Sequence, residues 1–140
     1  MSARWPPPSV GDIVWCHFPE LPALEPGPKP RPALVVKVER RTDGCNVQVA
    51  YGTSKRVSQL KSGEFAITRS LHPAAFELAG LEFDTKFDCR ALVDLPWSER
   101  FFKAPPRPAH GQTPKLGTLH ASVFRAAQAA FLAVKTQKGK

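Results

Sequence analysis

Two short segments carry side chains suited to chemistry on a phosphate group. Arg31 stands between two prolines, just ahead of an apolar run, and its planar guanidinium can bind two phosphate oxygens at once. Thr53 and Ser54 follow a second apolar run, in a polar turn that begins at Gly52. Their hydroxyls can orient a phosphate or a ribose hydroxyl. Both segments lie at expected strand–loop junctions, so the guanidinium and a hydroxyl can converge on one face.

Other groups that could do chemistry are scattered along the chain. The four histidines share no motif, and each is interpreted first as a structural residue. No carboxylate pair and no glycine-rich phosphate loop occurs. The three cysteines have no C-x-x-C spacing, which predicts neither a disulfide framework nor a zinc site; they are Cys16, Cys45 and Cys89. We therefore expect no metal and no cofactor.

Composition limits the class of protein. Isolated thiols suit a reducing cytoplasm. No apolar run approaches the roughly 18 residues of a membrane helix, and residues 1–8 contain no apolar segment of the signal-peptide kind. We therefore expect a cytoplasmic protein that makes no membrane contact.

The net charge of +8 is concentrated at one end of the sequence. Acidic and basic residues balance over residues 1–99, and the last 41 residues contain eight bases and no acid: Arg100, Lys103, Arg107, Lys115, Arg125, Lys135, Lys138 and Lys140. A polyanion would release counterions on binding such a segment. An acidic protein partner or a purely solubilising tail explains the charge equally well.

Hydrophobic patterning predicts several short strands and one long terminal helix. Apolar and β-branched runs predict strands over residues 12–18, 33–40, 46–51, 64–68 and 85–95. A short helix is expected near residues 73–79, with Ser70 as its N-cap and Gly80 closing it. Apolar spacing predicts a core helix over about residues 118–134.

These elements predict one mainly β domain over residues 1–140, a small antiparallel barrel of the SH3-like kind with a C-terminal helix. Residues 1–9 are expected to be a flexible N-terminus and residues 135–140 a basic tail. Six prolines place a long loop over residues 19–32, and a loop of that length is typically functional or mobile.

Three segments in this order resemble the MazF/PemK toxins of type II toxin–antitoxin systems. They are GDIVW at residues 11–15, RPALVV at residues 31–36 and GTSK at residues 52–55. The resemblance extends over most of residues 10–134. Many members carry a Gly-Ser-Glu segment before the arginine, where this chain has residues 23–28 with Glu25 as a loose counterpart.

The resemblance implies metal-independent cleavage of single-stranded RNA by attack of the ribose 2′-hydroxyl. It implies Arg31 and Thr53 as catalytic residues, with Ser54 as a substitute hydroxyl. Candidate RNA-binding residues are Lys29, Lys55, Arg56, Trp97, Arg100 and Lys115. For Trp97, Phe101 and Phe102, stacking on RNA bases competes with closing one end of the barrel or forming a dimer contact. The implied partners are RNA, an antitoxin with an acidic or disordered segment, and a second copy of the chain.

Two other interpretations remain open on the sequence. A non-catalytic SH3-like binding module is one, because GDIVW also resembles the opening of PWWP chromatin readers. Their name motif should follow the first strand closely, whereas Leu95-Pro96-Trp97 comes about eighty residues later. A toxin of the same fold directed at DNA gyrase is the other.

Overall fold

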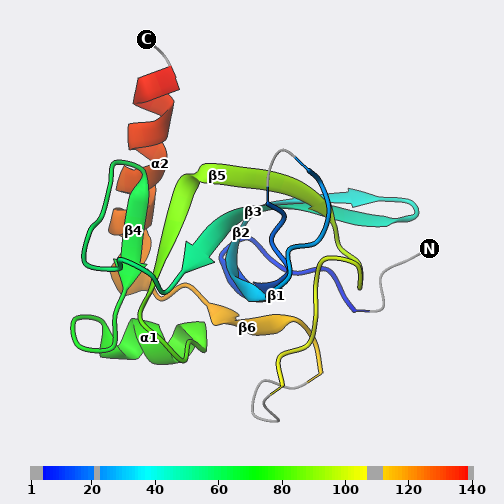
Figure 1. Ribbon diagram of the computed structural model, residues 1–140, viewed down its shortest axis with the longest axis horizontal. Helices are drawn as coiled ribbons and strands as arrows, with labels where there is room; N and C mark the ends of the chain where they lie inside the picture. Colours follow the sequence, from blue (N-terminus) through cyan, green and yellow to red (C-terminus); the bar gives the residue numbers. More distant parts are fainter. Residues whose placement is uncertain (1–4, 21–22, 107–111, 139–140) are drawn as a thin grey trace.

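The computed structural model describes residues 5–20, 23–106 and 112–138, and Figure 1 shows their arrangement. Within these ranges six strands form one antiparallel sheet in the order β4-β5-β3-β2-β1-β6. The sheet curls into a half-barrel. Its strands are β1 (Asp12–Cys16), β2 (Arg31–Arg41), β3 (Gly44–Thr53), β4 (Glu64–Ile67), β5 (Thr85–Pro96) and β6 (Lys115–Thr118).

In the described part of the chain, two helices and the 3₁₀ turn η2 accompany the sheet. Helix α1 (Pro73–Ala79) lies beside β6, and α2 (Phe124–Lys138) lies beside β4 and β5 (Figure 1). The turn η2 (Ala121–Val123) leads into α2. Helix α1 starts with proline and ends at Gly80, whose left-handed φ of 70° provides the C-cap. No helix in the described parts of the chain is both long and apolar enough to cross a bilayer.

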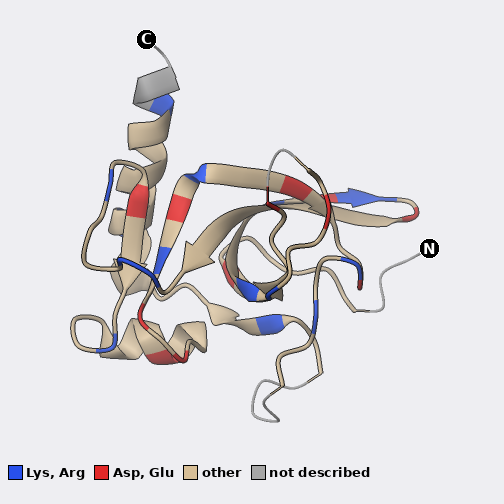
Figure 2. Cartoon of the chain, viewed as in Figure 1, with Lys and Arg blue, Asp and Glu red and all other residues tan. Residues whose placement is uncertain are grey.

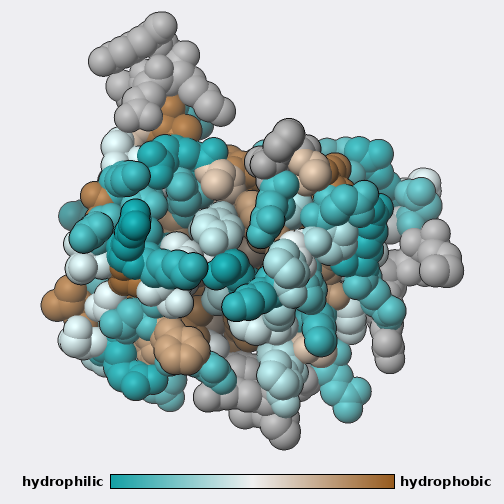
Figure 3. Space-filling view, in the orientation of Figure 1, coloured by the Kyte–Doolittle hydropathy of each residue, from teal (hydrophilic) through white to brown (hydrophobic). Residues whose placement is uncertain are grey.

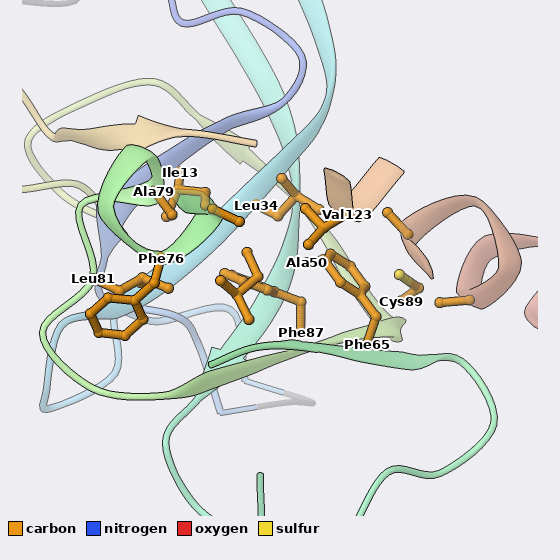
Figure 4. Packing of buried hydrophobic residues seen from close by; sticks show 14 of the residues in the cluster. Ile13, Leu34, Ala50, Phe65, Phe76, Ala79, Leu81, Phe87, Cys89 and Val123 are labelled. Carbon is orange, nitrogen blue, oxygen red and sulfur yellow. The ribbon is translucent and has the colours of Figure 1, made fainter. Parts of the chain in front are cut away.

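The curled sheet separates two hydrophobic clusters. Alternation along β1 sends Ile13 into the cluster beneath α1 and α2, and Val14 and Cys16 into the other. Figure 4 shows the first cluster, where Phe65 and Phe87 stack with ring centroids 5.6 Å apart. Strand β1 has two apolar faces because each packs against a different cluster. The mainly β fold with a C-terminal helix predicted from the sequence is confirmed.

Sequence patterning missed one strand and misassigned one cap. Residues 115–118 were expected to precede or begin the terminal helix, but they form β6 and pair with β1. Helix α1 has His72 at its N-cap, without a side-chain capping bond, so the prediction of Ser70 was wrong. The turn η2 has a side-chain cap: the His120 ring nitrogen accepts a hydrogen bond from the Ser122 backbone N–H at 3.0 Å.

The structure describes part of each chain end. Residues 1–4 lie outside the described part, but Trp5 packs edge-on against Trp97, with centroids 6.0 Å apart. The Pro6 carbonyl accepts a hydrogen bond from the Trp97 indole at 3.0 Å, so this segment is anchored to the core. Helix α2 runs to Lys138 and thus takes in most of the expected basic tail. The loop expected over residues 19–32 ends earlier, because β2 begins at Arg31.

Burial makes the cysteine thiols harder to ionise. It raises the pKa of Cys89 from about 9.0 to about 12, and it raises the pKa of Cys16 further. Both side chains lie in the core, Cys16 at 0% and Cys89 at 1% exposure. A thiol that stays protonated in the native state and ionises in the unfolded state links stability to pH.

We expect the free energy of unfolding to fall as pH rises from about 9 towards 12, where unfolded thiols ionise and native Cys89 does not. Cys89→Ala should be less stable near neutral pH, because it loses packing, but should show a shallower decline over that window. Urea unfolding at a series of pH values measures both slopes. Equal slopes in the two proteins would contradict the assignment.

Candidate active site

Arg31, Thr53 and Ser54 line one cavity of about 230 Å³. Arg31 opens β2 and Thr53 closes β3, so adjacent strands bring the two side chains to the same end of the sheet. The rest of the lining comes from five strands (β1, β2, β3, β5 and β6), from the segment between α1 and β5, and from loop residues before β2 and before β6. It is mainly apolar: Trp15, Pro30, Pro32, Gly52, Gly80, Leu81, Glu82, Phe83, Thr85, Pro105, Pro106 and Leu116.

The register between β2 and β3 sets this arrangement. Ala33 pairs with Tyr51, and the same register continued by two residues places Arg31 opposite Thr53. The strands approach closely between these positions. A Cβ on Gly52 would collide with the Pro32 carbonyl oxygen, so only glycine fits there. The close approach keeps the guanidinium and the hydroxyl on neighbouring strands.

An aromatic face supports Arg31. Its guanidinium carbon lies 5.8 Å from the centre of the Tyr51 ring, within the range of a cation–π interaction. Tyr51 in turn meets Phe18 edge-on at 5.1 Å. Arg31 also borders a second cavity of about 490 Å³, whose walls include Lys29, Tyr51 and Phe18. Arg31 therefore lies between the two cavities, and it is half-buried.

The turn after Thr53 presents polar groups in a fixed conformation. The Lys55 backbone N–H donates to Thr53 Oγ at 3.1 Å, which leaves the hydroxyl proton available for another acceptor. Arg56 has φ of 53°, a left-handed conformation uncommon for a non-glycine residue, and its carbonyl accepts from the Gln59 N–H at 3.0 Å. Lys55 and Arg56 are both exposed beside the hydroxyl.

A buried ion pair lies behind this turn. Lys86 pairs with Thr53 across the sheet, and its Nζ lies 3.1 Å from Glu64 Oε1. The two side chains are only 8% and 6% exposed. Lys86 Nζ also donates to the Gln59 carbonyl at 3.2 Å, so it ties the turn to β4 and β5.

The comparisons with known proteins decide the family. A family model of the PemK-like, MazF-like toxins of type II toxin–antitoxin systems matches residues 9–134. The chain belongs to this toxin family. A search of curated proteins found no match. The suspected family is thus confirmed, and membership makes the chain the toxin of a toxin–antitoxin pair, with an antitoxin as its partner.

The structure brings some predicted RNA-binding residues of the toxin to the cavities and leaves others away from them. Lys29 borders the second cavity. Lys115 lies 3.5 Å from the Asp12 carboxylate, and Arg100 binds Glu25 at 2.8 Å. Neither side chain lines the two cavities beside Arg31. Figure 2 shows the positions of basic residues along the chain interspersed with those of acidic ones over several elements.

Trp97 requires a correction. It was considered for stacking on RNA bases, but it is only 3% exposed, and Phe101 and Phe102 are 1% exposed. Its ring packs against the Phe102 ring with centroids 4.6 Å apart, and its indole N–H donates a hydrogen bond to the Pro6 carbonyl. Buried rings offer no face to a base, so these aromatics close one end of the barrel.

Sequence reasoning missed the apolar walls of the cavity in this toxin. Trp15 entered the sequence analysis only as part of the GDIVW segment, and Leu81, Phe83 and Leu116 attracted no prediction. The only signal was that Phe83 and Leu81 fall outside the expected strands, which does not distinguish a ligand wall from a core edge. Among the described residues no histidine lines the cavity, and His110 lies outside them. The His17 ring forms a hydrogen bond with the Gly27 carbonyl at 2.9 Å, a structural contact.

Removing the Lys86 charge should destabilise the fold, because the buried Glu64 carboxylate would lose its nearer cation and keep only the partly exposed Arg90 guanidinium, 3.6 Å away. We expect Lys86→Met to lower the free energy of unfolding by about 3 kcal/mol, measured by urea denaturation. Arg41→Ala is the control. It removes a surface pair with Glu39 in which both side chains are more than half exposed, and it should cost less than about 1 kcal/mol. Equal losses in both variants would refute the role of burial.

Proposed function

We propose that this toxin is an endoribonuclease that cuts single-stranded RNA without a metal ion. The observation that carries the proposal is the presence of Arg31 and Thr53 in the wall of one cavity, on adjacent strands. One supplies a fixed positive charge and the other a hydroxyl. Cleavage of RNA by its own 2′-hydroxyl needs groups that hold a phosphate and disperse the charge of its oxygens.

The reaction is an internal transesterification. The 2′-oxygen forms a bond to the adjacent phosphorus and loses its proton, while the bond from phosphorus to the 5′-oxygen breaks and that oxygen gains a proton. The products are a cyclic phosphate and a 5′-hydroxyl end. Negative charge grows on the two non-bridging oxygens in the transition state, which is where a preorganised cation has its largest effect.

Arg31 is assigned to charge stabilisation first and to proton transfer second. A guanidinium keeps its proton under ordinary conditions, so it is a poor general base but a constant donor of two parallel hydrogen bonds. Its contact with the Tyr51 ring limits the side-chain freedom that would be lost on binding. A preorganised arginine therefore stabilises the transition state better than a flexible lysine would at the same position.

Thr53 is assigned to orienting the phosphate or the attacking hydroxyl. Its oxygen already accepts the Lys55 N–H, and the remaining proton can be donated to a phosphate oxygen. Ser54 borders the same cavity and is the second hydroxyl in reach. Lys29, Lys55 and Arg56 add positive charge around the cavities, which attracts the RNA backbone.

The proposal extends to the assembly. A homodimer would join the cavities of two copies into a longer groove, with RNA lying across the interface. An antitoxin segment that is acidic or disordered would compete with RNA for the same positive surface. Binding there would block both the phosphate site and its approaches.

The test uses the purified toxin with a long single-stranded RNA in EDTA, followed by mapping of the cut ends. We expect discrete cuts with 5′-hydroxyl ends. Arg31→Ala should lower the rate at least about a hundredfold, the scale found when one group that stabilises transition-state charge is removed. Thr53→Ala should also be slower while remaining folded.

Arg41→Ala is the matched control, because it removes the same charge from an exposed position on β2 away from the cavity. It should cut like the wild type. Full activity in Arg31→Ala would refute the site. Intact RNA with the wild-type protein, across several transcripts, would favour a binding module or a toxin with another target.

A further inference from the structure

We propose that the cavity beside Arg31 is a subsite for one nucleobase, the base adjoining the phosphate that Arg31 holds. The inference rests on the proposed function for its ligand, RNA, and adds the walls that bind the base. The cavity measures about 230 Å³. Sites for drug-sized ligands are larger, roughly 300–1,000 Å³. The cavity therefore suits one planar ring system rather than two stacked nucleotides.

The walls of the cavity suit a base. One end carries the polar groups Arg31, Thr53 and Ser54, which can contact a phosphate or ribose. The remainder is dominated by rings and aliphatic chains: Trp15, Pro30, Pro32, Leu81, Phe83, Pro105, Pro106 and Leu116. A nucleotide has the same division, with a charged phosphate beside a flat, weakly hydrated ring that stacks on aromatic faces.

Phe83 is the wall residue least explained by folding. It is 67% exposed, the most exposed aromatic among the large hydrophobic residues of the described chain. Helix α2 carries another exposed phenylalanine, Phe124, at 48%, but that residue lies away from the cavity. Figure 3 shows hydrophobic residues as separate spots among hydrophilic ones on the viewed face of the molecule.

The segment that presents Phe83 is held in place by hydrogen bonds on both sides. Thr85 Oγ donates to the Phe83 carbonyl at 2.8 Å. The Arg69 backbone N–H donates to Asp84 Oδ1 at 2.7 Å, and its guanidinium donates to the Glu82 carbonyl at 3.3 Å. The Arg69 guanidinium also lies over the Phe76 ring at 4.8 Å. An exposed ring on a fixed backbone is a preorganised stacking platform, because little order is lost on binding.

Trp15 provides a second ring from a different element. It is half-buried on β1, where its backbone N–H donates to the Pro114 carbonyl at 2.8 Å and its carbonyl accepts from Lys103. These bonds fix the strand that carries the indole. A base in the cavity would therefore contact rings from β1 and from the segment before β5, while its phosphate reached Arg31.

The experiment measures base binding without cleavage. The probe is a short RNA that carries a 2′-deoxyribose at the mapped cut position, which removes the nucleophile, and the fluorescent base 2-aminopurine on one or the other side of that phosphate. Stacking on aromatic rings quenches this fluorophore. We expect strong quenching for one of the two positions on binding to the wild-type toxin.

Phe83→Ala should lose the quenching and bind the probe about tenfold more weakly, the scale of one lost base–aromatic stack. Phe83→Trp should restore both readouts, since it restores a stacking surface. Phe124→Ala is the matched control, an exposed phenylalanine outside the cavity, and should behave as the wild type. Substitution at an exposed position leaves the fold intact, which circular dichroism checks.

The outcomes separate the subsite from the proposed function. If the wild type cuts RNA, and Phe83→Ala binds the probe with unchanged affinity and quenching, the subsite is wrong and the nuclease proposal stands. If the wild type cuts no RNA, the nuclease proposal fails. A titration with all-RNA probes that carry 2-aminopurine at each position in turn still decides whether the cavity holds a base. Absence of quenching at all positions would overturn the inference.

Discussion

The close contact between β2 and β3 at Gly52 is the constraint on which the candidate site depends. Glycine lets the strand pass against the Pro32 carbonyl, where any side chain would collide. That contact holds the register in which Arg31 and Thr53 stand opposite each other. A slip of one residue would turn every β3 side chain to the other face of the sheet and send the hydroxyl away from the guanidinium. The juxtaposition of Arg31 and Thr53 is thus a consequence of backbone packing.

The surrounding sheet stabilises this register from both sides. Strand β5 pairs with β3 and brings Lys86 beneath the turn that follows Thr53. Its buried ion pair with Glu64 and its bond to Gln59 connect that turn to two strands. On the other side, the Tyr51 ring packs against the hydrophobic cluster that contains Val14 and Cys16, and the Arg31 guanidinium lies over that ring. Polar groups at the surface are therefore fixed by contacts that reach the core.

Local patterns predicted most of the fold because they depend on neighbours in the sequence. Alternation identified the β1, β2 and β3 strands, and proline at its start with Gly80 at its end identified α1. Strand β6 was missed because four residues carry little periodicity, and it exists through pairing with β1 about a hundred residues earlier. The burial of Trp97 was missed for a similar reason, since its contacts include the Trp5 ring and the carbonyl of Pro6, 91 residues earlier in the sequence.

The site was predictable in part. The chemistry of Arg31 and Thr53 can be deduced from residue type, but only family resemblance linked two segments separated by a hairpin. The apolar walls could not be predicted, because Leu81, Phe83 and Leu116 come from three-dimensional packing of segments that share no motif. Exposure of Phe83 is visible only once the fold is known.

The most direct test of the central claim replaces one ribose at a mapped cut by 2′-deoxyribose and compares cleavage with that of the all-RNA oligonucleotide in EDTA. If Arg31 and Thr53 act on a phosphate attacked by its own 2′-hydroxyl, the substituted strand should bind the toxin with similar affinity and stay intact at that position. Cutting of the substituted strand at the same bond would mean that another nucleophile attacks, and would contradict the mechanism derived from this cavity.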